Sequence, residues 1–145
     1  MTGSIYTWGF GPEAPKKPGF VWLLGIMQRF RIDTTIDLRR PSSQLANPPD
    51  PHAVAKLYEH ARAGHRILLV CSHADPRRCH RHALLALPIA QDAANYARAR
   101  AASPGALPIA PIEVWHVMDG MLVDPIELQR AIEEKRQPKG KKWRR

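Results

Sequence analysis

The sequence predicts a single α/β domain with a mainly parallel sheet of about four strands and helices on both faces. Segments of strand character alternate with segments of helical periodicity, and clusters of Pro, Gly and polar residues separate them. The segment 66–71 (RILLVC) is apolar after its first residue, which is typical of a central parallel strand covered on both faces. Because each helix returns the chain to the same edge of the sheet, such alternation gives mostly parallel strands.

The first half of the chain is predicted to run strand, helix, strand, helix. Residues 5–8 (IYTW) carry β-branched and aromatic side chains and precede a loop rich in Pro and Gly. The segment 20–30 (FVWLLGIMQRF) predicts a buried helix, and 32–38 (IDTTIDL) predicts the second strand. After another loop, 52–64 (HAVAKLYEHARAG) has apolar residues at helical spacing, and Gly64 is placed as a C-terminal cap.

The second half continues the alternation. After the central strand, Asp75 is a predicted helix N-cap and Pro76 a first helical residue, so a helix is expected from there to about Leu87. The remaining elements are a helix at 91–102 (QDAANYARARAA), a strand at 112–117 (IEVWHV) and a helix at 124–135 (DPIELQRAIEEK).

Positive charge is concentrated at the C-terminal end. The formal net charge is +9, and seven of the 22 Lys and Arg residues lie in the last eleven positions. We therefore assign 1–134 to the folded α/β domain and 135–145 to a basic, disordered tail. Such a tail can bind phosphates through counterion release and stack an aromatic ring on a base, or it can simply aid solubility. The tail residues expected to contact nucleic acid are Lys139, Lys141, Lys142, Trp143 and Arg144.

The composition points to a reducing compartment and away from a membrane. No apolar run approaches the roughly eighteen residues of a membrane span, and the first ten residues lack the basic and apolar regions of a signal peptide. Two cysteines are too few for a disulfide framework. We therefore expect a cytoplasmic protein whose cysteines are reactive, metal-bound or simply buried.

The carboxyl ends of the predicted strands carry many ionisable side chains. Ligands of open α/β sheets bind beyond these ends, so the residues that leave each strand define the expected site. We expect one of them, the strand histidine at 116, to be a hydrogen-bonded core residue. The residues at the four strand ends are Trp8 and Gly9, then Asp37, Arg39 and Arg40, then Cys71 to His73, and then His116 and Asp119.

Both cysteines lie in one cluster, 70–82 (VCSHADPRRCHRH), which admits three kinds of chemistry. A zinc site usually uses close ligand pairs such as Cys-x2-Cys, and because none is present we assign no metal ligand. The Cys-x5-Arg pattern of cysteine phosphatases needs small residues around a phosphate, whereas this loop has Asp75, Pro76 and no glycine. A reactive thiol is the interpretation that fits the cluster best.

The thiol interpretation gives the catalytic role to Cys79. We expect it in the first turns of a helix near three arginines, where its pKa should fall, while Cys71 ends a buried strand. Cys79 is then the nucleophile and His80 the proton carrier, and a pairing of Cys71 with His80 is equally open. The residues expected to bind the substrate or its phosphate are Asp37, Arg39, Arg77, Arg81 and Trp8.

The chain resembles a bacterial and phage family of domains of unknown function in three segments that occur in the family's order. These segments are IYTWG, TTIDLRRPSS and ILLVCSHADPRRCHRHALLA. The family's motifs are Ile-Tyr-Thr-x-Gly, Val-Asp-x-Arg and Cys-x7-Cys-His-Arg, the second of which reads Ile-Asp-Leu-Arg in this chain. The family is distantly related to the YeaO-like proteins. The resemblance implies a compact Rossmann-like domain and no particular reaction. This chain differs in having Phe10 where the family has His and His73 where it often has an acid. The residues implied around one pocket are Asp37, Arg39, Cys71, Cys79, His80 and Arg81.

The sequence leaves three functional hypotheses. The leading one is a protein directed at a nucleotide or nucleic acid, as a base- or nucleotide-modifying enzyme with a Cys, His and Arg site. The alternative is a noncatalytic module that sequesters a nucleotide-like ligand or a partner protein, since a sheet of this design holds ligands equally well without chemistry. A structural zinc-binding protein is the third. No cofactor and no oligomeric state are indicated.

Overall fold

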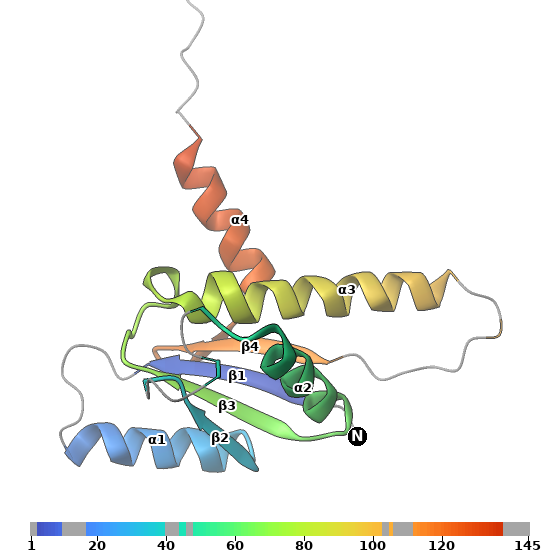
Figure 1. Ribbon diagram of the computed structural model, residues 1–145. Coiled ribbons are helices and arrows are strands. Elements are labelled where there is room, and N and C mark those ends of the chain that lie inside the picture. Colours follow the sequence, from blue (N-terminus) through green and yellow to red (C-terminus); the bar gives the residue numbers. More distant parts are fainter. Residues whose placement is uncertain are drawn as a thin grey trace, which may run out of the picture.

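The computed structural model describes residues 3–9, 17–39, 44–45, 48–102, 105 and 112–137, apart from the side chains of 17–20 and of residue 100. It is an α/β fold built on a five-stranded mixed sheet, mostly parallel, with order β2-β3-β1-β4-β5 (Figure 1). The strands are β1 (Ser4–Gly9), β2 (Thr34–Asp37), β3 (Arg66–Cys71), β4 (Glu113–Met118) and β5 (Met121–Val123). The expected α/β class is confirmed.

The fifth strand was not expected, and it forms a hairpin with β4. β5 pairs with β4 in the antiparallel sense, while the other strand pairs are parallel. Asp119 (φ 49°) and Gly120 (φ 75°) form the two-residue connection. Positive φ at both positions is the geometry of a tight hairpin turn, which an Asp-Gly pair favours. Asp119 therefore turns the chain at the sheet edge.

The helices are α1 (Lys17–Arg29), α2 (Pro51–Arg62), α3 (Leu87–Ala101) and α4 (Pro125–Arg136). The carboxylate of Asp50 accepts from the N–H of His52 at the start of α2, and Asp124 caps α4 in the same way. Both capping aspartates are followed by proline, which suits the first helical position. α4 continues through Arg136, two residues into the segment assigned to the tail, and 138–145 lie outside the described residues.

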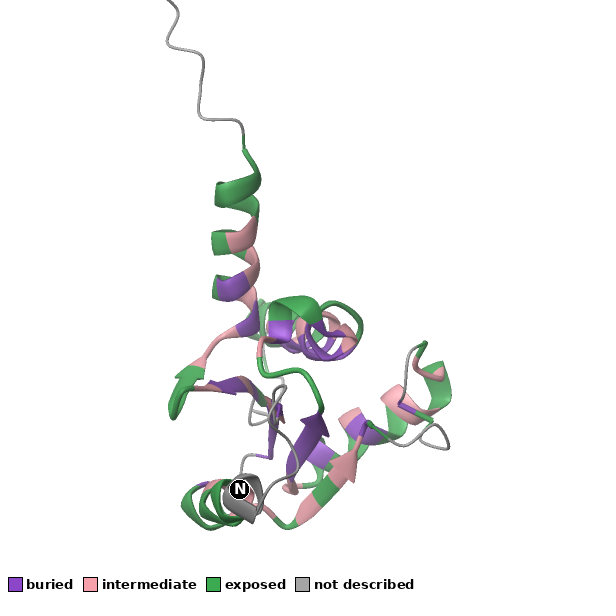
Figure 2. Ribbon diagram, turned by 90° about the vertical axis from the view of Figure 1, so that its left-hand side faces the viewer, coloured by how far each residue is buried: buried purple, intermediate pink, exposed green. Residues whose placement is uncertain are grey.

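Two apolar clusters pack on the opposite faces of the sheet, and Figure 2 shows the buried residues along the strands and on the adjoining helices. One cluster joins Ile5, Ile67 and Leu69 to α2 and α3. The other joins Tyr6 and Leu68 to α1. Since successive strand residues face opposite sides, β1 presents one face to α1 and the other to α3.

α1 is less buried than its apolar sequence indicated. The side chains of Val21 and Trp22 are 69% and 68% exposed, and Leu24 is 46% exposed. Only the face with Ile26 and Met27 packs against the sheet. The prediction of a buried helix was therefore wrong, because α1 is a surface helix with apolar residues on both sides.

The expected continuous helix from Pro76 is interrupted. Residues Pro76–Arg78 form one 3₁₀ turn, Cys79 is extended (φ −127°, ψ 142°), and a π-helical segment, Arg81–Ala86, then leads into α3. Asp75 does cap the turn, its carboxylate accepting from the N–H of Arg77. The prediction that Cys79 lies inside a helix was wrong, since the chain changes direction at this residue.

Candidate functional site

The two cysteines form a buried thiol pair at the carboxyl end of β3. Their Sγ atoms lie 2.9 Å apart, and both thiols are free. Cys71 is the last residue of β3 and is 4% exposed, while Cys79 is 7% exposed. The extended backbone at Cys79 brings its sulfur to the strand end. Cys71 and Cys79 together form the thiol pair.

Arg81 is a fully buried cation beside the thiol pair. Its Nε–H donates to Thr7 Oγ1 over 3.3 Å, and its two amino groups donate to the backbone carbonyls of His73 and Ala74. Within the described ranges, no carboxylate lies at ion-pair distance from this guanidinium. A buried charge without a counterion is costly, so a negative charge nearby is strongly favoured.

The thiol pair supplies that negative charge. The pKa of Cys71 is lowered to about 4, chiefly because the Cys79 thiol donates a hydrogen bond to its sulfur. Burial opposes this shift, while hydrogen bonds from His73 and the charge of Arg81 assist it. The pKa of Cys79 is raised, because it holds the proton of that hydrogen bond and because it is buried. The two sulfurs titrate as a coupled pair that shares one proton, and the directions of the two shifts favour the thiolate on Cys71.

Two histidines flank the sulfurs. His73 Nδ1 lies 3.8 Å from Cys71 Sγ, and His80 Nδ1 lies 3.8 Å from Cys79 Sγ. The other ring nitrogen of His80, Nε2, is 3.2 Å from the carbonyl oxygen of Leu45 and must carry a proton to bond to it. In the neutral ring, Nδ1 of His80 is then an acceptor facing the Cys79 thiol. This arrangement gives the proton of Cys79 a second acceptor.

The thiol pair and His73 also resemble part of a metal site. One ligand atom from each of Cys71, His73 and Cys79 lies within 4.8 Å of the other two. Two thiolates and an imidazole suit zinc, although two thiolates on one tetrahedral zinc stand about 3.8 Å apart. The sulfurs are closer than that here, so a zinc ion requires them to separate. Long-range folding, rather than a close ligand pair in sequence, assembles this group.

A chain of hydrogen bonds, the polar chain, runs from Arg81 to the surface. Thr7 Oγ1 is 2.5 Å from His116 Nδ1, and His116 Nε2 is 2.9 Å from His82 Nδ1. His82 Nε2 is 3.0 Å from the side-chain oxygen of Gln129, whose amide donates to Glu133. Since the Gln129 oxygen can only accept, and a neutral imidazole has one donor and one acceptor nitrogen, both histidines carry their proton on Nε2 and Thr7 donates to His116. The polar chain comprises Thr7, His116, His82, Gln129 and Glu133.

His116 is neutral within this chain. Its pKa is lowered to about 3, chiefly by burial and to a lesser extent by the charges of His82 and Arg81. The expectation of a hydrogen-bonded core histidine is confirmed, since His116 is fully buried. Thr7 and His82 were not singled out from the sequence. The alternation of β1 was a usable signal, because Thr7 shares the inward face of buried Ile5 and Gly9.

The backbone of the loop after β3 passes very close to Gly9, the last residue of β1. Gly9 lies beside Cys71 in the sheet register, and a Cβ at Gly9 would overlap the carbonyl oxygen of His73. It would also stand 2.9 Å from the Arg81 guanidinium. Only glycine therefore allows the loop after β3 to fold over the end of β1 and present its carbonyls to Arg81.

The phosphate-binding candidates differ in exposure. Arg39 is exposed and makes a two-bond ion pair with Asp37, and Arg77 makes a similar exposed pair with Asp75. The pKa of Arg39 is raised, first by the bond to Asp37 and to a lesser extent by the charge of Cys71, which places it near the thiol pair. Arg40 lies outside the described residues.

Two other candidates are placed away from open solvent. The Arg81 guanidinium has no exposed surface and bonds to protein groups, so in this geometry it acts on the thiol pair rather than on a solvent-borne phosphate. Trp8 is half-buried and packs in the apolar cluster on the α1 face. The Arg81 guanidinium is closed to solvent, whereas Trp8 keeps part of its surface exposed.

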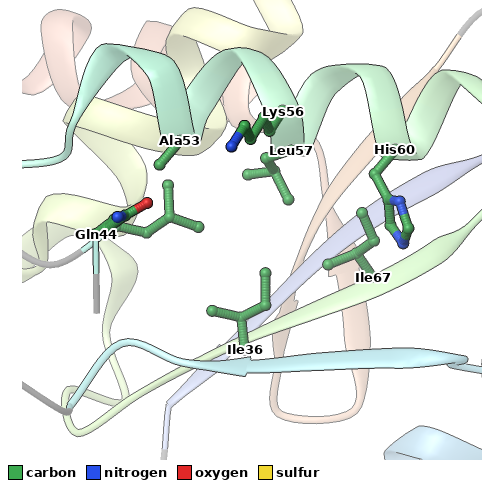
Figure 3. A pocket seen from close by; sticks show the side chains of 8 residues that line it. Ile36, Gln44, Ala53, Lys56, Leu57, His60 and Ile67 are labelled. Atoms are coloured by element: carbon green, nitrogen blue, oxygen red, sulfur yellow. The ribbon is translucent and has the colours of Figure 1, made fainter. Parts of the chain in front are cut away.

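A pocket of about 350 Å³ opens between α2 and the strands β2 and β3 (Figure 3). Its walls are mainly aliphatic, and Lys56 and His60 add polar groups on the α2 side. One wall residue, Leu45, accepts the hydrogen bond from His80 described above. The pocket therefore lies one imidazole ring away from the thiol pair. Its lining residues are Ile36, Gln44, Leu45, Ala53, Lys56, Leu57, His60 and Ile67.

The fold and this site define an α/β domain with a buried thiol pair at the carboxyl ends of parallel strands. Residues 31–87 match the model of a family described as Domain of unknown function DUF488, which confirms the family resemblance. The matched segment contains Asp37, Arg39 and both cysteines. No curated protein and no solved structure matches the chain. None of the helices in the described part of the chain has the length and apolar character needed to cross a membrane.

Proposed function

We propose that the protein is a nucleotide- or nucleic-acid-directed enzyme whose nucleophile is the Cys71 thiolate. The observation that supports this most strongly is the 2.9 Å contact of the two sulfurs beside the buried Arg81. The sequence favoured Cys79 as the nucleophile. The electrostatics favour the reverse assignment, because the hydrogen bond from Cys79 and the charge of Arg81 stabilise the Cys71 thiolate.

In the proposed reaction, the Cys71 sulfur adds to an electron-poor carbon of a nucleobase. The new bond is S–C, the π electrons of the attacked double bond move to a ring heteroatom, and Cys79 supplies the proton that this atom takes up. His80 Nδ1, the ring nitrogen that faces Cys79, then takes up a proton from solvent and passes it to that sulfur. In this scheme each titratable group acts on the neighbour beside which it already lies in the structure.

Two exposed arginines are suited to the substrate's phosphate, Arg39 after the end of β2 and Arg77 two residues before Cys79. Arg39 and Arg77 are each held by one aspartate, and a phosphate dianion can replace that carboxylate as a two-bond partner. Arg78 is exposed next to Arg77. The basic tail, 138–145, belongs to the same proposal as a nonspecific contact with nucleic acid.

We extend the proposal to the fold class and the cellular location of the protein. We assign the domain to the Rossmann-like three-layer folds, on the alternation of elements and the two apolar clusters. A cytoplasmic location suits free thiols, since that compartment keeps cysteines reduced. The partner is a nucleotide-like small molecule or a nucleic acid.

A binding and trapping experiment tests the proposal. Anisotropy with fluorescein-labelled single-stranded DNA and RNA, and competition by the four nucleoside triphosphates, gives affinity at two salt concentrations. We expect Arg39→Gln with Arg77→Gln to weaken binding about tenfold or more, and removal of 138–145 to flatten the salt dependence. Intact mass spectrometry should show a base or nucleotide adduct on wild-type protein and none on Cys71→Ala.

The outcomes separate the hypotheses. Binding without any adduct, unchanged in Cys71→Ala, supports the noncatalytic module instead of the enzyme. Absence of binding to every probe contradicts the nucleotide-directed function altogether. Arg98→Gln is the matched control for charge, because Arg98 lies on α3 and bonds to Ala94 and Asn95 of its own helix.

A zinc-binding protein is the second candidate, favoured by the convergence of Cys71, His73 and Cys79. It predicts about one zinc per chain in freshly purified protein, released on thiol modification and measured with a colorimetric chelator. His73→Ala should weaken zinc binding without removing either thiol. Protein that is folded, metal-free and unable to take up added zinc rules this candidate out.

A further inference from the structure

We propose that the thiol pair is a redox modification site, at which a hydroperoxide converts Cys71 and Cys79 into a reversible intramolecular disulfide. The inference concerns the sulfurs themselves and holds whether or not the protein acts on nucleotides. The pair is already in contact at 2.9 Å, and a disulfide needs an S–S distance of about 2.05 Å. A movement of about 0.9 Å therefore closes the bond.

The local backbone permits this movement. Cys71 is the last residue of β3, and Cys79 is a single extended residue between a 3₁₀ turn and a π-helical segment. Cys79 is therefore not held inside a regular helical ladder, and its side chain can turn about the Cα–Cβ bond without unwinding α3. The sulfurs lie close to the surface, because the neighbouring His73 is exposed with its ring 3.8 Å from Cys71 Sγ.

The surroundings favour Cys71 as the sulfur that is oxidised first. Its sulfur lies 2.9 Å from Cys79 Sγ and 3.8 Å from His73 Nδ1, and the buried Arg81 donates to the backbone carbonyl of His73, two residues further on. These groups hold the thiolate form, which is the form that reacts with peroxides. Cys79 keeps its proton and is placed to resolve the product. A small hydroperoxide suits a site where the two cysteine residues are only 4% and 7% exposed.

The chemistry balances in two steps. The Cys71 thiolate attacks the terminal OH oxygen of the hydroperoxide and the O–O bond breaks, so that Cys71 becomes a sulfenic acid. The alkoxide or hydroxide that leaves takes a proton from solvent and becomes an alcohol or water. The Cys79 sulfur then attacks the sulfenic sulfur, the S–O bond breaks, and the hydroxide takes the Cys79 proton to leave as water. Two thiols are oxidised to one disulfide, and one hydroperoxide is reduced.

Arg81 makes the disulfide easy to reverse. In the reduced state the Cys71 thiolate balances the buried guanidinium, and the disulfide removes that negative charge. Because no carboxylate among the described residues replaces it, the oxidised state carries an uncompensated buried cation. Stabilisation of the reduced form makes a disulfide more oxidising, so a simple dithiol should reduce it readily. The thiol pair thus has the properties of a switch rather than of a structural disulfide.

Peptide mapping tests the proposal on the full chain. After treatment with hydrogen peroxide and blocking of free thiols, tryptic digestion without reductant should yield 67–77 (ILLVCSHADPR) linked to 79–81 (CHR), because Arg77, Arg78 and Arg81 are cleavage sites. Intact mass should fall by about 2 Da, and dithiothreitol should restore it. Gel filtration should show that the product remains the same size.

Two single variants identify the order of events. Cys79→Ser should stop at a sulfenic acid on Cys71, seen as about 16 Da added and trapped by dimedone. Cys71→Ser should resist the same dose, and thermal melting of both variants establishes that they fold. Oxidation of a single cysteine to the sulfinic acid in wild-type protein, crosslinks between chains only, or two unchanged thiols at high peroxide would overturn the proposal. No nucleotide is present, so the result is independent of the proposed enzyme activity.

Discussion

His116 Nε2 and His82 Nδ1 lie 2.9 Å apart in the interior, and this bond ties β4 to the helical segment that carries Arg81. The pair is the middle of the polar chain, which has the Arg81 cation at one end and the Glu133 carboxylate at the other. Every neutral member donates once and accepts once along the chain. This direction of the chain requires both histidines to carry their proton on Nε2, while the Arg81 charge is held in place by the carbonyls of His73 and Ala74 as well as by Thr7.

Acid should destabilise the protein through His116. Its pKa is about 3 in the folded protein and about 6.5 when unfolded, so between these values the unfolded chain binds more protons. The contribution of His116 to the free energy of unfolding is therefore fully present above pH 6.5. It decreases as the pH drops through this window, by up to about 1.4 kcal/mol per pH unit. Urea unfolding at pH 7.5 and pH 5 measures the loss.

His116→Gln should be less stable at pH 7.5 but should lose less on acidification. His52→Gln is the control, because His52 is exposed at the start of α2. Equal acid losses in wild type and His116→Gln would show that His116 does not titrate as its burial requires.

The reactivity of Cys71 should depend on Cys79. In wild-type protein the alkylation of Cys71 by iodoacetamide should vary little between pH 6 and 8, because the pKa of Cys71 is about 4. Cys79→Ala removes the hydrogen bond that contributes most to this shift, so the pKa should rise and the rate should increase with pH. Liquid chromatography with mass detection of the 67–77 peptide measures the rate. Identical pH profiles in the two proteins would show that the low pKa of Cys71 does not depend on its contact with Cys79.

Arg81→Lys should be strongly destabilising. A lysine ammonium cannot reach Thr7 and the carbonyls of His73 and Ala74 together, and buried acceptors would lose their donors. We expect a loss of about 3 kcal/mol in the free energy of unfolding. Arg78→Lys, three positions earlier and exposed, should change stability by less than about 0.5 kcal/mol. Similar losses in both variants, by denaturant unfolding, would contradict the buried role of Arg81.

Local rules in the sequence were enough for most of the fold. The capping pairs before α2 and α4 depend only on Asp followed by Pro, and the apolar run of β3 depends only on burial of both faces. The same rule placed a helix start at Pro76 and failed after one turn. There the contacts of Arg81 with Thr7, 74 positions away, decide the path of the chain. β5 was missed although the Asp119-Gly120 turn signals a hairpin.

The chemistry of the site depended on distances that the sequence does not contain. Cys-x7-Cys spacing is compatible with many arrangements, and only the fold brings the two sulfurs to 2.9 Å. The exchange of roles between Cys71 and Cys79 follows from that contact and from the burial of Arg81. His82 looked like one more member of a basic cluster because its partners, His116 and Gln129, lie in distant elements.

Gly9→Ala should disturb the thiol site from outside it. A methyl group at this position would overlap the His73 carbonyl, which is backbone and cannot rotate away, and would crowd the Arg81 guanidinium. The loop after β3 must then move off the end of β1, at a cost of about 3 kcal/mol or more in the free energy of unfolding. The same movement withdraws an acceptor from Arg81 and alters the field at Cys71, so the alkylation rate of Cys71 at pH 6 should fall.

Gly25→Ala is the matched control, since its added methyl meets nothing within 4 Å on α1 and should stabilise the helix by up to about 1 kcal/mol. If Gly9→Ala kept wild-type stability and Cys71 reactivity, the two backbones would have room that the structure does not give them.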